Sequence, residues 1–211
     1  MTDNFNDDIE YYNSKIMEYK NNKKGNCSID NVIKYVLEQN SLEEAINIAI
    51  MSKDKNGNFH PHQYRIYNDV YENFIQNLLS IKNKIKDSKN FDELIKTIEK
   101  YKPFRAGELF CYDVALRIGH YLKLLPDRIY IHAGTRKGLS NLLKRRIYEQ
   151  TINKQNLPEP FCSCDLTPGQ LEDFLCINKE IFINGINEDI TNCKFPTSIK
   201  RKQGCNSKSC F

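Results

Sequence analysis

Residues 102–119 read KPFRAGELFCYDVALRIG, and this stretch decides the fold more than any other part of the chain. Apolar spacing on either side of it predicts one helix over residues 91–101 and a second over residues 107–124. Pro103 ends the first helix or follows its end, a glycine precedes the second, and Ala115 allows close packing. The pattern is that of a helix-hairpin-helix, in which a helix N-terminus and backbone N–H groups can hold a phosphate. An ordinary tight turn between two helices has the same spacing.

The rest of the chain also follows helical spacing. Long alternation of apolar and polar residues, which would indicate β-strands, is nearly absent. We therefore expect a mainly α protein: one compact helical domain over residues 1–192, with the helix-hairpin-helix at about 91–124. A basic, cysteine-containing tail over residues 193–211 should be loosely ordered. Further helices are predicted over residues 9–19, 32–37, 41–51, 62–86, 138–149 and 171–176, with N-terminal caps at Ser28, Ser41 and Thr167.

Composition excludes several classes of protein. The chain has 211 residues and a mean hydropathy of −0.62, and no apolar stretch approaches the ~20 residues of a membrane helix. Its acidic first residues lack the apolar core of a signal peptide, so we expect a cytoplasmic protein with reduced cysteines and no membrane partner. The net charge is only +4, but six bases and one acid lie between residues 127 and 146, where an anionic partner would bind.

The order of segments after the hairpin resembles the helix-hairpin-helix DNA glycosylase superfamily. Residues 126–132 read PDRIYIH: an apolar segment ends at a histidine and a further helix begins. The chain looks most like small bacterial proteins described as having an 8-oxoguanine DNA glycosylase fold, and the resemblance covers residues 90–150. It implies a helical fold, binding to nucleic acid or a modified purine base, and cleavage of an N-glycosidic bond with the base extruded into a pocket.

Three positions depart from the family's pattern. Arg105 stands where the family has the first glycine of the hairpin, and Leu109 stands where its bifunctional members have the nucleophilic lysine. Tyr130 stands where the family has the catalytic aspartate. Leucine cannot form a Schiff base, and tyrosine is a poor substitute for a carboxylate near neutral pH. The catalytic candidates are therefore His132, whose ordinary pKa lies near neutrality, and the acids Asp113 and Asp127.

Nucleic-acid contacts are expected at two segments. Gly107 and Arg105 belong to the hairpin, and residues 133–138 read AGTRKG, a loop with glycines and bases before a predicted helix. From these segments the expected phosphate-binding residues are Arg105, Gly107, Gly134, Thr135, Arg136 and Lys137. A base pocket is expected at His60, His62 and Gln63. No cofactor is expected.

Two other classes of function remain open. A non-enzymatic module with the same fold would bind DNA, a nucleobase or a nucleotide, with a role in anti-phage defence by association. A metal-dependent hydrolase could be built on His60, His62 and His132, although packing at a helix start is the preferred interpretation of the first two. Cys162, Cys164, Cys176 and Cys193 could supply four thiolates, but their spacing is not that of a zinc finger.

Overall fold

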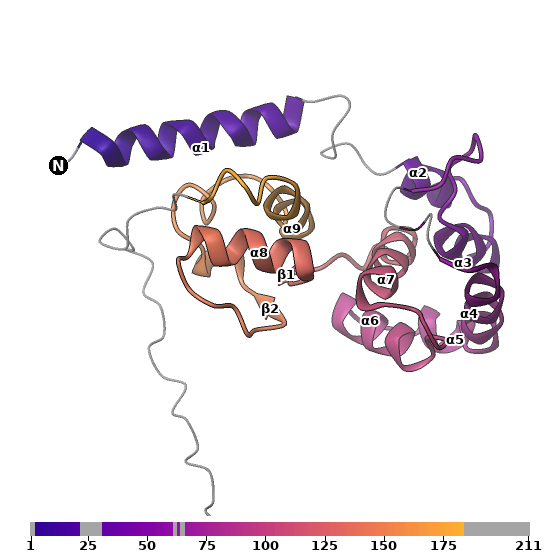
Figure 1. The fold of residues 1–211 in the computed structure, drawn as a ribbon. Coiled ribbons are helices and arrows are strands. Elements are labelled where there is room, and N and C mark those ends of the chain that lie inside the picture. Colours follow the sequence, from indigo (N-terminus) through magenta and orange to yellow (C-terminus); the bar gives the residue numbers. More distant parts are fainter. Residues whose placement is uncertain (1–2, 22–30, 61–62, 64–65, 184–211) are drawn as a thin grey trace, which may run out of the picture.

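The structure is a computed structural model that describes residues 3–21, 31–60, 63 and 66–183 (Figure 1). It is mainly α-helical, as the sequence predicts. The strands β1 (Ile129–Tyr130) and β2 (Thr151–Ile152) pair antiparallel. The helices are α1 (Asp3–Asn21), α2 (Asn31–Leu37), α3 (Leu42–Met51), α4 (Asn68–Ser80), α5 (Lys82–Lys86), α6 (Phe91–Lys100), α7 (Glu108–Leu122), α8 (Ala133–Leu142) and α9 (Pro168–Ile177), with a short 3-10 helix at Lys154–Asn156.

The buried apolar residues form two clusters, which we call the first and second core. Helices α2 to α7 surround the first core, which includes Phe74, Leu94 and Val114. Helices α1, α8 and α9 surround the second core, and Figure 1 shows them gathered apart from the other six. We expected one domain over residues 1–192; within the described residues the core is divided in two.

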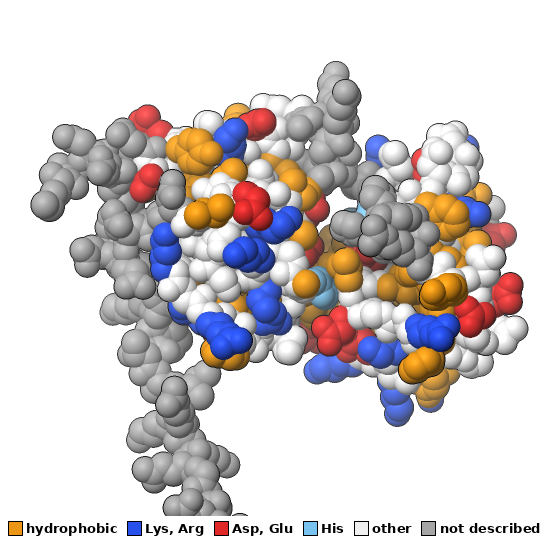
Figure 2. All heavy atoms as spheres, viewed as in Figure 1, with side chains coloured by type: hydrophobic (Ala, Val, Ile, Leu, Met, Phe, Trp, Pro, Cys, Tyr) orange, Lys and Arg blue, Asp and Glu red, His pale blue; other side chains and the backbone are white. Residues whose placement is uncertain are grey.

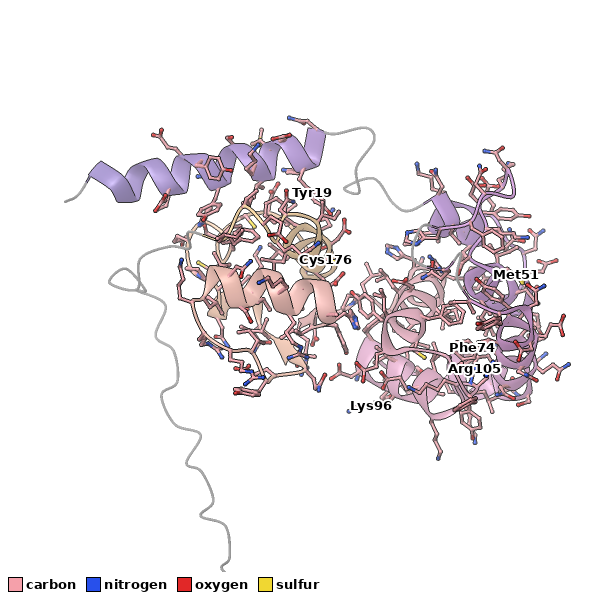
Figure 3. The ribbon with its side chains drawn as sticks, in the orientation of Figure 1. Tyr19, Met51, Phe74, Lys96, Arg105 and Cys176 are labelled. Atoms are coloured by element: carbon pink, nitrogen blue, oxygen red, sulfur yellow. The ribbon has the colours of Figure 1, made fainter. Side chains whose placement is uncertain are left out.

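Helix α1 belongs to the second core although it begins the chain. Tyr12, Ile16 and Tyr19 lie on one helical face, as their spacing predicts, and all three are buried. The ring of Tyr12 contacts Phe161 and Phe182, with centroids 5.4 and 5.6 Å away. Figure 3 shows Tyr19 lying between α1 and α9. The second core is therefore built from both ends of the described chain.

Strand β1 joins the two cores. Successive side chains of a strand point to opposite faces. Ile129 and Ile131 accordingly belong to the second core, whereas Tyr130 between them packs into the first. His132, which follows Ile131, is the N-cap of α8. The chain thus places His132 at the boundary between the two groups of helices.

The N-terminal caps predicted at Ser41 and Thr167 are confirmed, and both are capping boxes. Ser41 Oγ accepts a hydrogen bond from the backbone N–H of Glu44, and the Glu44 side chain accepts one from the Ser41 N–H. Thr167 and Gln170 make the same reciprocal pair at the start of α9. No helix in the described part of the chain is long and apolar enough to cross a membrane.

Two helix boundaries differ from the prediction. The helix expected over residues 62–86 begins only at Asn68 and is interrupted at Ile81, which leaves the helical region of backbone angles. The helix expected over residues 138–149 is α8, which starts five residues earlier and ends at Leu142. Lys144, just beyond its end, has a left-handed φ of 48°, so the chain turns where apolar spacing predicted more helix. The 193–211 tail and the cap predicted at Ser28 lie outside the described residues.

Candidate functional site

The candidate site lies where the two groups of helices meet. It consists of Tyr112 and Asp113 on α7, His132 before α8, Glu172 on α9 and Gln63 before α4, and we call these five residues the junction cluster. The fold brings Tyr112, Asp113 and His132 together, although Asp113 and His132 are 19 residues apart in the sequence. Three of the five, Asp113, His132 and Gln63, are among the residues predicted from the sequence.

His132 presents a polar atom without a partner. Its ring lies 4.5 Å from that of Tyr112 between centroids, and within the described residues its Nε2 is buried with no hydrogen bond. Burial lowers the pKa of His132, and the carboxylates of Asp113 and Glu108 oppose this shift in part. The imidazole is therefore neutral near pH 7, and its Nε2 can donate or accept one hydrogen bond, depending on the tautomer.

Tyr112 presents a second such atom beside the first. Its side chain is almost completely buried, and its hydroxyl also has no hydrogen-bond partner among the described residues. Burial raises the pKa of Tyr112 well above its ordinary value, and the nearby carboxylates of Glu172 and Asp113 raise it further. The phenol thus stays protonated. A buried polar group without a hydrogen bond costs about 1–3 kcal/mol, so a molecule that hydrogen-bonds to both atoms would be favoured here.

Asp113 is held by a chain of buried polar groups. Gln63 Nε2 donates a hydrogen bond to Asp113 Oδ2, and Gln63 Oε1 accepts one from Arg117 Nη2 at 3.3 Å. Because a guanidinium only donates, this pair fixes which way the Gln63 amide points. Arg117 is itself buried, and its Nη1 donates to Ala49 O at 3.1 Å and to Ser52 Oγ at 2.7 Å. The end of α3 therefore determines the orientation of the Asp113 carboxylate.

The cluster is acidic and aromatic. Glu108, Asp113, Glu172 and Asp173 are the carboxylates that act on the pKa of His132 or Tyr112. Tyr112 lies against Tyr130 and Phe91, with ring centroids 5.5 and 6.0 Å away. Carboxylates repel phosphate but accept hydrogen bonds from N–H groups. This arrangement suits a planar ligand with N–H donors.

The segment AGTRKG, expected to be a phosphate-binding loop, is instead the start of α8. A Cβ at Gly134 would overlap Cys176 Sγ, and one at Gly138 would overlap the backbone carbonyl of Leu175. Figure 3 shows Cys176 on the α9 side of this contact. Thr135 is fully buried, and its hydroxyl donates to the Glu172 carboxylate. Both glycines and the threonine therefore serve the packing of α8 on α9.

Arg136 and Lys137 differ in their surroundings. Arg136 Nη1 donates to the carbonyls of Ile147 and Glu149 at 2.8 and 3.1 Å, and Nη2 donates to that of Ile131 at 3.2 Å. The guanidinium is engaged with backbone, where we expected it to meet a phosphate. Lys137 is exposed, as a phosphate contact would require. Figure 2 shows lysine and arginine side chains gathered over the half of the molecule that contains α8 and β2.

Arg105 and Gly107 lie in the turn between α6 and α7. Arg105 has a left-handed φ of 71°, a conformation that favours glycine. Arg105 stands where the helix-hairpin-helix pattern has its first glycine. Gly107 is the N-cap of α7, and a Cβ there would meet nothing within 4 Å. The backbone at Gly107 is therefore open to an approaching group.

The remaining predicted residues are dispersed. Asp127 is exposed and pairs with Arg128 at 3.0 Å, beside a surface hollow of about 290 Å³ that its side chain lines. His60 is partly buried, and its backbone N–H donates a hydrogen bond to Ser52 O. His62 and Cys193 lie outside the described residues. In the described ranges, histidine, cysteine and acidic side chains form no group of three or more that could hold a metal ion.

Sequence reasoning missed Tyr112 and Glu172. Their spacing on α7 and α9 indicates only buried helical faces, and sixty residues separate them. A charged residue at the buried position Glu172 was the one available signal, because buried acids are rare unless paired.

Comparison with family models, with curated proteins and with solved structures finds no match to this chain.

Proposed function

We propose that this protein binds nucleic acid and takes an extruded purine base into the junction cluster, as a DNA glycosylase-like protein. The observation that carries the proposal is a pair of buried atoms, His132 Nε2 and Tyr112 Oη, that hydrogen-bond to none of the described residues and lie near the Asp113 carboxylate. A planar base with N–H groups would satisfy both atoms and stack in the same aromatic surroundings.

The chemistry of the cluster favours a modified purine. Guanine has an acceptor at N7, whereas 8-oxoguanine carries a hydrogen there. The carboxylates of Asp113 and Glu172 and the neutral imidazole of His132 can accept a hydrogen bond from that N–H. A site lined by acceptors would therefore prefer 8-oxoguanine to guanine. The open backbone at Gly107 and the exposed Lys137 would hold phosphates outside the cluster.

In the enzymatic form of this proposal the reaction is hydrolysis. Water adds to C1′ of the sugar, the bond from C1′ to the base breaks, and the base leaves with the proton that the attacking water loses. Asp113, oriented by Gln63, would stabilise the positive charge that develops on the sugar and accept a proton from water. Tyr112 and His132 would hydrogen-bond the departing base. No covalent intermediate is proposed, because Leu109 stands where a lysine nucleophile would be needed.

The second candidate is a binding module without cleavage. Tyr130 stands where the family's catalytic acid would be, and its hydroxyl is already engaged in donating to Asp92. The same ligand would then be held without being broken down. Base binding is common to both candidates, and cleavage distinguishes them.

The test uses labelled duplexes with guanine or 8-oxoguanine at one position. Anisotropy across a salt series measures affinity, and a single-turnover assay measures release of the base. We expect tighter binding to the 8-oxoguanine duplex. Asp113→Asn should abolish release while leaving most of the binding, and His132→Gln should reduce the preference for the modified base. Lesion-preferring binding without release selects the binding module. Equal, weak binding to both duplexes, unchanged in either variant, contradicts the proposal.

A further inference from the structure

The turn between α6 and α7 carries an unusual group of exposed aromatic side chains. Phe104 is 86% exposed and Tyr67, at the N-cap of α4, is 65% exposed. The guanidinium of Arg105 lies over both rings, 5.4 Å from the Tyr67 centroid and 5.6 Å from that of Phe104. We call these three residues the aromatic tip. They come from two separate elements and meet at the surface.

The turn holds the aromatic tip in place. The N–H of Ala106 donates to Pro103 O at 3.1 Å, which closes a four-residue turn, and the Ala106 side chain is buried in the first core. Arg105 is the third residue of this turn, where the left-handed φ of 71° is suited to glycine. An arginine in that conformation destabilises the fold relative to glycine, and such strain is characteristic of functional positions. Glycine in its place would lack the guanidinium that lies over the two rings.

The charges near the aromatic tip favour nucleic acid as its partner. Lys100 and Lys102 are exposed and, with Arg105, give three cations and no acid over residues 100–105. Glu99 and Glu108 flank this run. Exposed aromatic rings and arginine guanidinium groups stack on unpaired bases, and nearby cations bind the backbone.

We propose that Tyr67, Phe104 and Arg105 form a stacking platform for an unpaired base of single-stranded or mismatched nucleic acid. The platform rests on the proposed function in one respect, namely that the chain binds nucleic acid. It adds a second contact, distinct from the junction cluster, and predicts a preference for strands whose bases are not paired.

The chain supplies a matched control for this platform. Tyr148 is 73% exposed and has Arg146 over its ring at 5.5 Å, so it pairs one exposed ring with an arginine, as Phe104 does, beside the second core. Because Phe104 and Tyr148 are both largely exposed, alanine at either position should leave the fold intact. A general loss of exposed aromatic surface would therefore affect both variants alike.

The experiment titrates the full-length protein into a single-stranded oligonucleotide that contains 2-aminopurine, whose fluorescence falls when it stacks. Phe104→Ala should remove the quenching and weaken binding by at least about fivefold, with no change in salt slope because no charge is lost. Tyr148→Ala should behave as the wild type. Arg105→Gly should weaken binding and reduce the salt slope by about one, yet raise the melting temperature because the strained residue is gone.

Two outcomes with the variants overturn the platform. One is a Phe104→Ala protein that quenches and binds as the wild type does, and the other is an equal loss in Tyr148→Ala. If Asp113→Asn or His132→Gln still alters duplex binding in that case, the proposed function stands, and the aromatic tip would contact some other kind of partner. If the wild type binds neither single strands nor duplexes, the proposed function and the platform are both overturned.

Discussion

His132 shows how a single residue can lower stability in return for a binding position. Its pKa is lowered by burial, so the unfolded chain binds a proton more readily than the folded protein does. Below the ordinary histidine value of 6.5, the unfolded state therefore holds more protons, and the free energy of unfolding falls as the pH decreases. Above that value this contribution to stability is complete.

We predict that His132→Gln makes stability less dependent on pH. Denaturant unfolding between pH 5 and 7.5 should show a smaller fall in the free energy of unfolding for this variant than for the wild type. Equal slopes for the wild type and His132→Gln would show that burial of His132 is not linked to folding.

For single residues, the sequence indicated the ionisable side chains of the junction cluster better than the buried residues that hold them in place. His132 and Asp113 could be singled out because their chemistry is visible in the residue type. Arg117 could not, because an arginine in an amphipathic helix is usually solvated, and only the packing of α3 against α7 buries it. Asp127 was chosen only as an acid that could replace the missing aspartate, and the structure leaves it exposed and paired with Arg128.

Helix α8 illustrates how packing between elements overrides local preference. Two glycines within six residues disfavour a helix, so residues 133–138 were expected to form a loop. The same glycines allow α8 to approach α9 closely, because neither position has room for a Cβ. Capping boxes, by contrast, are local, and for this reason Ser41 and Thr167 were predicted correctly.

We predict a graded series among three glycine-to-alanine variants. Gly138→Ala places a methyl group against the backbone of α9, which cannot rotate away, and should cost about 1–3 kcal/mol of stability. Gly134→Ala meets the side chain of Cys176 and should cost less, with partial rescue by Cys176→Ala. Gly107→Ala meets nothing and should be nearly neutral. Denaturant unfolding measures all three, and equal losses would contradict close packing of α8 on α9.

At the scale of the whole molecule, two cores predict two regions that respond separately to mutation. Tyr12 on α1 is buried against Phe161 and Phe182 in the second core. Tyr12→Ala should destabilise that core by about 3 kcal/mol through loss of the ring and the cavity left behind. Hydrogen exchange should quicken in α9 and remain near the wild-type rate in α3, which belongs to the first core.

A matched change in the first core tests the same division. Phe74 is fully buried among α3, α4 and α7, so Phe74→Ala should quicken exchange in α3 and spare α9. A uniform increase across both cores in either variant would mean that the molecule opens as one cooperative unit. The sequence predicted a single domain because 211 residues suit one domain, and helical spacing alone does not reveal which helices share a core.

The pairing of α1 with the far end of the chain also governs how the protein is made. Its buried face meets partners that extend to Phe182, so about 160 residues must be translated after α1 before these partners exist. At ribosomal rates this takes on the order of ten seconds or more. Helices α2 to α7 can meanwhile complete their own core. Throughout that interval the apolar face formed by Tyr12, Ile16 and Tyr19 lacks its native partners, so we expect this face to remain open to chaperones until Phe182 has been translated.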